Sequence, residues 1–320
     1  MRLLGAELTR FVTRRAVLVV LLAAAALVVV VVGSAAYNTR PPDGTEKAAA
    51  EQMLTRQQQL NEDVYAECVK DPEAYFGDLV GTDDCESLRP ALEWYLPRPE
   101  LDIADEVGNQ GRVVVVLLVG MAVLVGAFFA GRDWTTGSMS TQLLHEPRRL
   151  RLWLTKALAV VLGTTAAAAV LLVVFWGVLA VVAGTRDLST PTDSWQLVAQ
   201  TSGRALALVA AVSLGSYALT MALRHTVATL GLLFAYAVVG EGLAASLPFE
   251  KMSQWSVSHN VLAWVHDGVE VHDRSLCADV TGACSPTYQL DLQHSATYLG
   301  ALLVLAVVGS VLTFRRRDLP

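Results

Sequence analysis

Six long runs of apolar residues constrain this fold more than any other feature of the sequence. They cover residues 16–37, 113–131, 152–183, 203–223, 226–247 and 295–314. A transmembrane helix needs about 20 apolar residues, and a water-soluble core does not require so many uninterrupted runs of that length. The sequence therefore predicts an all-α polytopic membrane protein with six transmembrane helices. The third run is long enough to kink, tilt or project from the bilayer.

Arginines concentrate in four short segments that fall on one side of a six-span arrangement. They lie before the first run, between the second and third, between the fourth and fifth, and after the sixth. Because basic flanks are retained in the cytoplasm, we expect both termini, residues 1–15, 132–151 and 315–320, to be cytoplasmic. Loops 38–112, 184–202 and 248–294 are then extracytoplasmic. The scarcity of lysine relative to arginine favours a GC-rich bacterial genome, and hence a bacterial plasma membrane.

Residues 1–15 have the apolar spacing of a helix that lies in the membrane interface. Leu4, Leu8 and Phe11 share one face at helical spacing. A charged leader that only sets the topology is the alternative. The arginine pair before the first run and the small residues after it imitate a signal peptide, but that run exceeds the usual core of about 7–15 residues. We expect the first span to be retained.

All four cysteines lie in the two long loops that are expected outside. Disulfides belong to oxidising compartments, and four cysteines allow three connectivities. We favour pairings that each close a short loop within one segment, with four free thiols as the alternative. The favoured pairs are Cys68–Cys85 and Cys277–Cys284.

The first outer loop is acidic and long enough for a small subdomain. Residues 45–70 have a helix-forming composition, and prolines divide the rest into short pieces. The sequence predicts a helical subdomain fixed by one disulfide. In the second outer loop, residues 248–265 contain Trp255 and Trp264, which favours a position at the membrane interface.

Small residues recur at every fourth position of the fourth span. Such spacing forms a flat strip that another helix can approach closely, although an alanine-rich chain also produces it by chance. The strip consists of Gly203, Ala207, Ala211 and Gly215.

Glu241 is the one acidic residue deep within an apolar run, flanked by glycines towards its outer end. An ionisable group there usually faces a cavity or a partner, and a snorkelling interfacial carboxylate is the alternative. We expect Arg204 to be its nearest charge partner, and the two are candidate pathway residues.

The sequence contains no motif of a nucleotide-binding or hydrolytic site. It lacks G-x-x-x-x-G-K-[ST], H-E-x-x-H and G-x-S-x-G. The four histidines of the second outer loop match no compact zinc spacing, so we predict solvated loop histidines and no metal, cofactor or catalytic residue. These are His259, His266, His272 and His294.

The cytoplasmic segment 132–151 is too short for a domain and too patterned for a plain turn. Residues 133–138 are typical of a helix start, and Pro147 stops any helix that follows. Arg148, Arg149 and Arg151 suit lipid headgroups or an acidic partner. We predict a short helix across the cytoplasmic surface.

The stretch "DWTTGSMSTQLLHEPRRLRLWLTK", with the final "FRRRDL" and the order of spans, resembles the permease subunits of ABC-2 type ABC transporters. That family commonly has an acidic residue, then a Gly-Ser/Thr pair, then Leu, Pro, Arg and Lys at similar offsets, with Glu more often at the acidic position. The matching residues here are Asp133, Gly137, Ser138, Leu144, Pro147, Arg149 and Lys156.

The resemblance implies that a separate ABC ATPase subunit, which binds ATP and Mg²⁺, docks on this segment. It also implies a second permease copy, a lipid bilayer around both, no nucleic acid, and export. Closure of the ATPase pair is expected to push residues 133–146 and tilt spans one, two and five. A membrane-anchored sensor or assembly factor and a secondary transporter are alternatives. The coupling residues are expected to be Asp133, Trp134, Thr135, Thr136, Gly137, Ser138, Leu144, Glu146, Pro147, Arg148 and Arg149.

Overall fold

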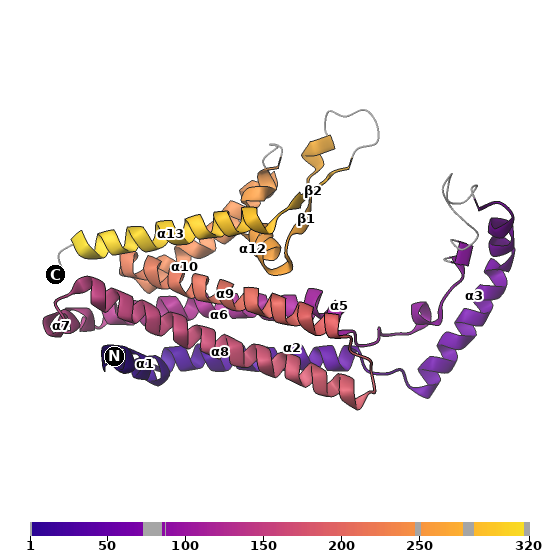
Figure 1. The fold of residues 1–320 in the computed structure, drawn as a ribbon, viewed down its shortest axis with the longest axis horizontal. Coiled ribbons are helices and arrows are strands. Elements are labelled where there is room, and N and C mark those ends of the chain that lie inside the picture. Colours follow the sequence, from indigo (N-terminus) through magenta and orange to yellow (C-terminus); the bar gives the residue numbers. More distant parts are fainter. Residues whose placement is uncertain (1, 73–84, 87, 247–250, 278–284, 317–320) are drawn as a thin grey trace. The chain divides into compact units, whose positions relative to one another are not determined.

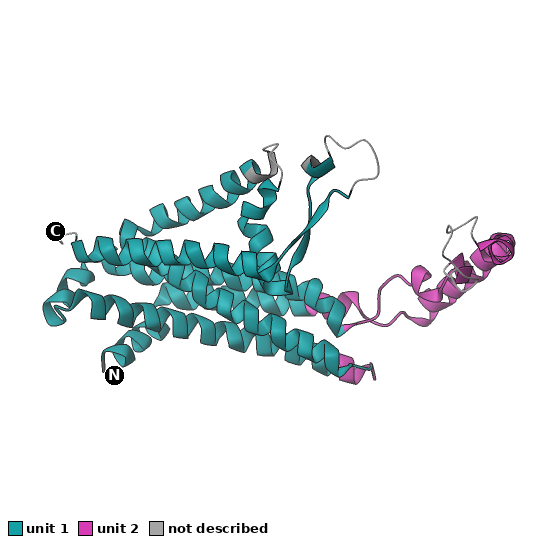
Figure 2. Cartoon of the chain, turned by 45° about the horizontal axis from the view of Figure 1, so that its top comes forward, with its two compact units in different colours: residues 1–32, 103–181, 189–320 teal, residues 33–102, 182–188 magenta. Residues whose placement is uncertain are grey.

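The computed structural model describes residues 2–72, 85–86, 88–246, 251–277 and 285–316. The chain divides into two compact units, coloured separately in Figure 2. The larger unit comprises Met1–Val32, Ile103–Val181 and Ser189–Pro320, and the smaller comprises Gly33–Asp102 and Val182–Leu188.

Helices make up most of both units (Figure 1). The long ones are α2 Arg15–Asn38, α3 Gly44–Lys70, α6 Gln110–Thr135, α8 Arg149–Thr185, α9 Thr192–Leu223 and α13 Leu292–Arg316. The shorter α-helices are α1 Arg2–Thr13, α5 Ile103–Gly108, α7 Ser138–His145, α10 Thr226–Ala235, α11 Glu241–Ser246 and α12 Val257–His266. A π-helical turn, η3 Tyr236–Gly240, joins α10 to α11, and the remaining short turns are η2 Leu92–Tyr95, η4 Met252–Trp255 and η5 Arg274–Cys277.

The protein is an all-α polytopic membrane protein, as predicted. Among the described residues, six helical segments are long and apolar enough to cross a bilayer. They are Arg15–Asn38, Ile103–Thr135, Arg149–Thr185, Thr192–Leu223, Thr226–Leu243 and Leu292–Arg316. The fourth begins well before the predicted residue 203, because Pro191 sets the helix start and polar residues continue the backbone hydrogen bonds beyond the apolar run.

Helices α6 and α9 pack closely in the centre of the larger unit. A Cβ atom on Gly126 would lie 2.6 Å from the carbonyl oxygen of Ser213, so only glycine permits this approach. Ser216 Oγ donates to the carbonyl of Val123 at 2.6 Å. Large side chains such as Phe129 and Tyr217 are fully buried beside this contact.

The strip of small residues on α9 lies mostly away from this contact. Gly203 and Ala207 are exposed within the chain, and no atom lies within 4 Å of a Cβ built on Gly203. At Gly215 such a Cβ would make an ordinary 3.6 Å contact with Leu303 of α13. Within the described chain, the close approach of α9 to α6 is made at Gly126 and not along the strip.

A short hairpin follows α12 and was not predicted from the sequence. Strand β1 Val269–His272 pairs antiparallel with β2 Thr287–Leu290, with Val269 opposite Leu290 and Val271 opposite Tyr288. Ala263, Val271 and Leu290 form its small apolar core. Each strand has only four residues, which is too short for a clear alternation of apolar and polar side chains.

The smaller unit is built around α3, and the predicted helix over residues 45–70 is confirmed. Asp43 caps it by accepting from the backbone N–H of Thr45 at 3.0 Å and of Glu46 at 2.8 Å. Glu46 in turn accepts from the Asp43 N–H at 2.9 Å, which completes a capping box. Arg98 donates to both carboxylate oxygens of Glu46, with Nη1 3.0 Å from Oε1.

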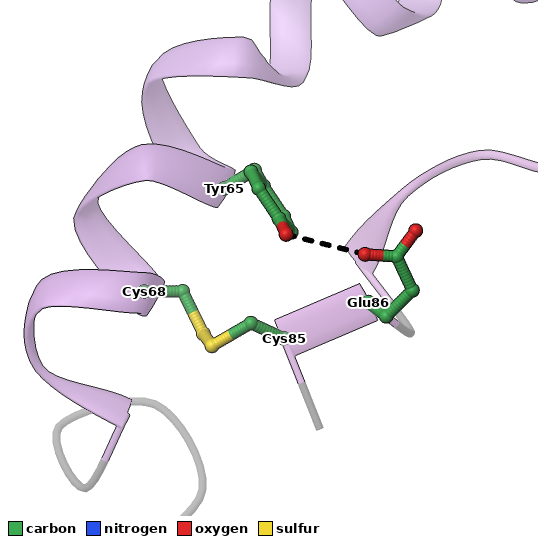
Figure 3. The surroundings of a disulfide bond; sticks show 4 residues. All are labelled: Tyr65, Cys68, Cys85 and Glu86. Carbon is green, nitrogen blue, oxygen red and sulfur yellow. Dashed lines mark hydrogen bonds between the residues drawn. A yellow bond between two sulfur atoms is a disulfide. The ribbon is translucent and has the colours of Figure 1, made fainter. Parts of the chain in front are cut away.

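The disulfide Cys68–Cys85 is present, as predicted, and joins the end of α3 to the segment that follows (Figure 3). Tyr65, one turn earlier, donates its hydroxyl to Glu86 at 3.2 Å. The second predicted pair, Cys277–Cys284, includes a residue outside the described part of the chain.

Candidate functional site

The segment between the second and third spans folds as a short helix, α7, set off by Gly137. Gly137 has φ 68° and ψ 4°, a left-handed conformation that costs glycine little and most other residues about 1–2 kcal/mol. No atom lies within 4 Å of a Cβ built there, so the backbone conformation and not space selects glycine. The turn redirects the chain from α6 into α7 at the end of the larger unit that also holds α1 and the last turn of α13 (Figure 1).

Asp133, in the last turns of α6, is the centre of a buried cluster of charges. Its carboxylate accepts from Arg14 Nη2 at 2.5 Å and from Lys156 Nζ at 2.6 Å. Ser138, the first residue of α7, donates to Asp133 Oδ1 at 3.1 Å. Arg14 also donates to the carbonyl of Phe129 and lies over that ring. Asp133 therefore connects α7 to the junction of α1 and α2 and to α8.

Lys156 joins two carboxylates and has no solvent exposure. Its Nζ lies 3.0 Å from Glu7 Oε2 of α1 as well as 2.6 Å from Asp133 Oδ2. Arg10 Nη1 also lies 2.8 Å from Glu7 Oε1, but the Arg10 side chain is 45% exposed. Two buried carboxylates thus face two buried or largely buried cations, so the cluster is balanced in charge. We call Glu7, Arg14, Asp133 and Lys156 the charge cluster.

Close apolar packing surrounds the charge cluster. The rings of Phe11 and Phe129 lie 5.9 Å apart between α1 and α6. A Cβ on Gly163 of α8 would lie 2.6 Å from the Phe11 ring, and one on Gly131 would overlap Thr226 at the start of α10. Small residues therefore let α1, α6, α8 and α10 converge here. Displacing any one of these helices strains the others, because packed interiors leave little free space.

Further polar contacts tie this end to the last span. Arg149 of α8 donates to the carbonyls of Phe314 at 3.4 Å and Arg315 at 3.3 Å in α13. Trp153 Nε1 donates to Ser310 Oγ at 3.2 Å, and its carbonyl accepts from Tyr217 of α9 at 3.0 Å. The start of α8 is thus held by α9 and α13 as well as by the charge cluster.

The two sides of α7 differ in how far they are buried by the rest of the described chain. Leu144 is 85% exposed, while Met139 on the opposite side is buried. Glu146 pairs with Arg151 at 3.3 Å. A single exposed apolar side chain is common at a protein surface and by itself identifies no partner.

The predicted coupling residues separate into an anchored and an exposed set. The anchored set consists of the buried Asp133 and the half-buried Trp134, Ser138, Glu146 and Arg149. Ser138, Glu146 and Arg149 are held by the hydrogen bonds and ion pair described above. Trp134 packs edge-on against the ring of Phe314, with the ring centroids 6.3 Å apart. The exposed set is Thr135, Thr136, Gly137, Leu144, Pro147 and Arg148. Asp133, Ser138 and Lys156, singled out as motif positions, meet in one site.

Sequence reasoning missed Glu7 and Arg14 as members of this site. Both were assigned to a surface helix and its flank, whereas Glu7 is 1% exposed. Lys156 lies within the third apolar run, where a lone cation is costly and requires a partner. This cost could have indicated, from the sequence alone, that carboxylates elsewhere in the chain pair with Lys156.

Glu241 and Arg204 are not paired in the described residues, contrary to expectation. Glu241 accepts from Ser256 Oγ at 2.5 Å and from the Ser258 N–H at 3.0 Å. Arg204 instead pairs with Asp267 at 3.0 Å. The expected pair does not form because Glu241 follows the π-helical turn and lies beside the start of α12. There a serine hydroxyl and a backbone N–H donate to its carboxylate.

Comparisons of the chain with protein-family models, with curated proteins and with solved structures found no match.

Proposed function

We propose that this chain is the membrane-spanning permease subunit of an ABC transporter, which exports its substrate with ATP hydrolysed by a separate ATPase subunit. The observation that carries the proposal is the junction at α7. A short surface helix is fastened through Ser138 and Asp133 to a buried charge cluster shared by α1, α6 and α8. Such a junction suits a segment that receives force from a partner protein.

The contacts supply a route from α7 to the spans that are expected to move. Arg14 connects Asp133 to the start of span one, and Gly131 packs directly on Thr226 at the start of span five. A push on residues 133–146 therefore acts on spans one, two and five together. Lys156 adds span three to the same group.

The chain carries no phosphate-binding loop, so ATP and Mg²⁺ belong to the partner ATPase. The exposed part of α7 around Leu144 is the proposed contact surface for that ATPase. Two permease copies and two ATPase copies form the working unit in the bacterial plasma membrane, with both termini and α7 in the cytoplasm, as the arginine-rich flanks favour.

Substitution of Gly137 tests the proposal. The full chain is expected to co-purify from its host membrane with an ABC ATPase, and Gly137→Trp is expected to abolish that association while leaving the amount of protein in the membrane unchanged. Gly137→Asn is the matched control, because asparagine tolerates the left-handed conformation. Quantitative mass spectrometry of the purified complexes measures the ratio of ATPase to permease.

Retention of the ATPase at the wild-type ratio by Gly137→Trp would place the docking surface elsewhere. Loss of the variant from the membrane would show that Gly137 serves folding, and the proposal would then depend on Leu144→Glu, which alters only an exposed side chain.

A further inference from the structure

The smaller unit contains a pocket of about 490 Å³. Its walls come from the linker between α2 and α3, from the segment around η2, and from the residues after α8, all within the magenta unit of Figure 2. A volume of this size lies within the range of about 300–1,000 Å³ that is usual for sites of small molecules.

Chain continuity places the pocket at the level of lipid headgroups. Thr39 and Arg40 follow directly on the candidate span Arg15–Asn38, and Arg186 follows directly on Arg149–Thr185. A chain extends at most about 3.6 Å per residue, so these lining residues cannot lie far from the ends of two membrane spans.

Three cations on the pocket wall have no carboxylate partner among the described residues. Arg186 donates to the carbonyls of Thr39 and Ala36, each at 2.7 Å, and neutral acceptors leave its charge uncompensated. Arg40 stacks on the ring of Tyr37 at 4.0 Å. Lys47 lies on the first turns of α3 with an exposed side chain.

Arg98, also on the wall, provides a contrast, because Glu46 neutralises it in a bidentate pair. Glu100 is the one carboxylate among the described lining residues. The unpaired cations outnumber it, so the pocket is positive although residues 38–112, which supply most of its wall, are acidic overall.

Apolar side chains complete the wall. Leu92, Leu96 and Leu188 line the same pocket as the cations, and proline rings add to the apolar surface. Charged and apolar groups side by side favour a ligand that carries an anion at one end and a hydrocarbon at the other.

We propose that this pocket binds an anionic phospholipid. The phosphate group lies among Arg40, Lys47 and Arg186, and the start of an acyl chain packs on the leucines. A free phosphate shares the anionic chemistry but gains nothing from the apolar wall, so a lipid binds more tightly than inorganic phosphate.

Photolabelling of the full chain in nanodiscs tests this site. The probe is phosphatidylglycerol with a photoactivatable acyl chain in a phosphatidylcholine background, and the control probe is phosphatidylcholine with the same chain. Peptides that contain residues 88–100 and 186–188 are expected to be labelled by the anionic probe and not by the neutral one. Unlabelled phosphatidylglycerol should compete, and an excess of inorganic phosphate should not.

The paired variant Arg40→Gln/Lys47→Gln is expected to weaken labelling of these peptides by about fivefold for each cation removed, as for basic residues at an anionic membrane surface. Arg56→Gln/Lys70→Gln removes the same charges from exposed positions of α3 outside the pocket, and should leave labelling unchanged. Equal loss in both variants, equal labelling by the neutral probe, or equal competition by inorganic phosphate would overturn the proposal.

Discussion

Lys156 illustrates what a single residue imposes on this fold. A lysine within an apolar span requires a compensating charge, and here it has two, Glu7 from α1 and Asp133 from α6. The arrangement remains neutral only because Arg14 offsets the second carboxylate. Replacement of any one member therefore leaves an unbalanced buried charge.

We expect Lys156→Met to destabilise the protein by about 3–5 kcal/mol, since removal of one partner strands a buried charge. The paired variant Asp133→Asn/Lys156→Met restores neutrality and should cost less than the sum of the two single changes. Unfolding in mixed micelles by chemical denaturant measures the free energies. Arg10→Gln is the control, because its half-exposed pair with Glu7 contributes at most about 1 kcal/mol. Strict additivity would contradict the linked cluster.

Sequence and structure agree where the pattern is local. The six spans were predicted because length and apolarity are properties of one segment, and the short helix α7 because the residues that start and stop it are also local. The charge cluster was not predicted, because Glu7, Asp133 and Lys156 are far apart in the sequence and only packing brings them together. The Glu241–Arg204 pair was wrong for the same reason: its true partner groups lie on a helix that follows an unpredicted π-helical turn.

Among the elements, α3 is the most dependent on specific polar contacts. Its apolar positions are few, with Ala50 and Cys68 the buried residues. Its two ends are instead fastened by a capping box with Arg98 and by a disulfide.

The first turn of α3 should lose protection in acid. The hydrogen bond from Arg98 is the main cause that holds the pKa of Glu46 below its ordinary value of 4.5, with the Asp43 N–H also contributing. Because the folded pKa is the lower one, this stabilisation is present above about pH 4.5 and is lost as pH falls through the depressed value. Hydrogen exchange of the full chain, corrected for intrinsic rates, measures residues 44–50. Glu46→Gln should reduce the pH dependence, and the remainder belongs to Asp43, whose pKa is also lowered, chiefly by its hydrogen bond with the Thr45 hydroxyl. An unchanged profile in that variant would assign the pH dependence to groups other than Glu46.

The other end of α3 depends on Cys68–Cys85, whose sequence separation is 17. Reduction should destabilise the local structure by roughly 3 kcal/mol, the cost typical of opening a loop of this size. Hydrogen exchange should accelerate in the last turns of α3 and remain unchanged in α6 and α9 of the larger unit. Acceleration in α6 as well would mean that the two units share their stability.

At the scale of the whole molecule, the described chain is a bundle of six candidate membrane spans, and the proposed permease would take its energy from a partner ATPase. Much of the span surface is apolar and exposed within the chain, as at Val227 and Phe234, which suits contact with lipid or a second copy. Because the sequence has no phosphate-binding loop, the purified chain alone should show no ATP hydrolysis above a buffer blank in a coupled phosphate-release assay. Addition of the co-purified ATPase should restore turnover. Robust hydrolysis by the isolated chain would exclude a permease that relies on a partner.

The charge cluster also has a consequence for how the chain is made. Synthesis proceeds from the N-terminus, so Glu7 and Asp133 are already at the membrane when Lys156 is delivered with the third span. In that order of synthesis, both carboxylates that pair with Lys156 in the fold precede it into the membrane region. A rearranged gene that encoded α8 ahead of α1 would deliver the same lysine to hydrocarbon with neither carboxylate present.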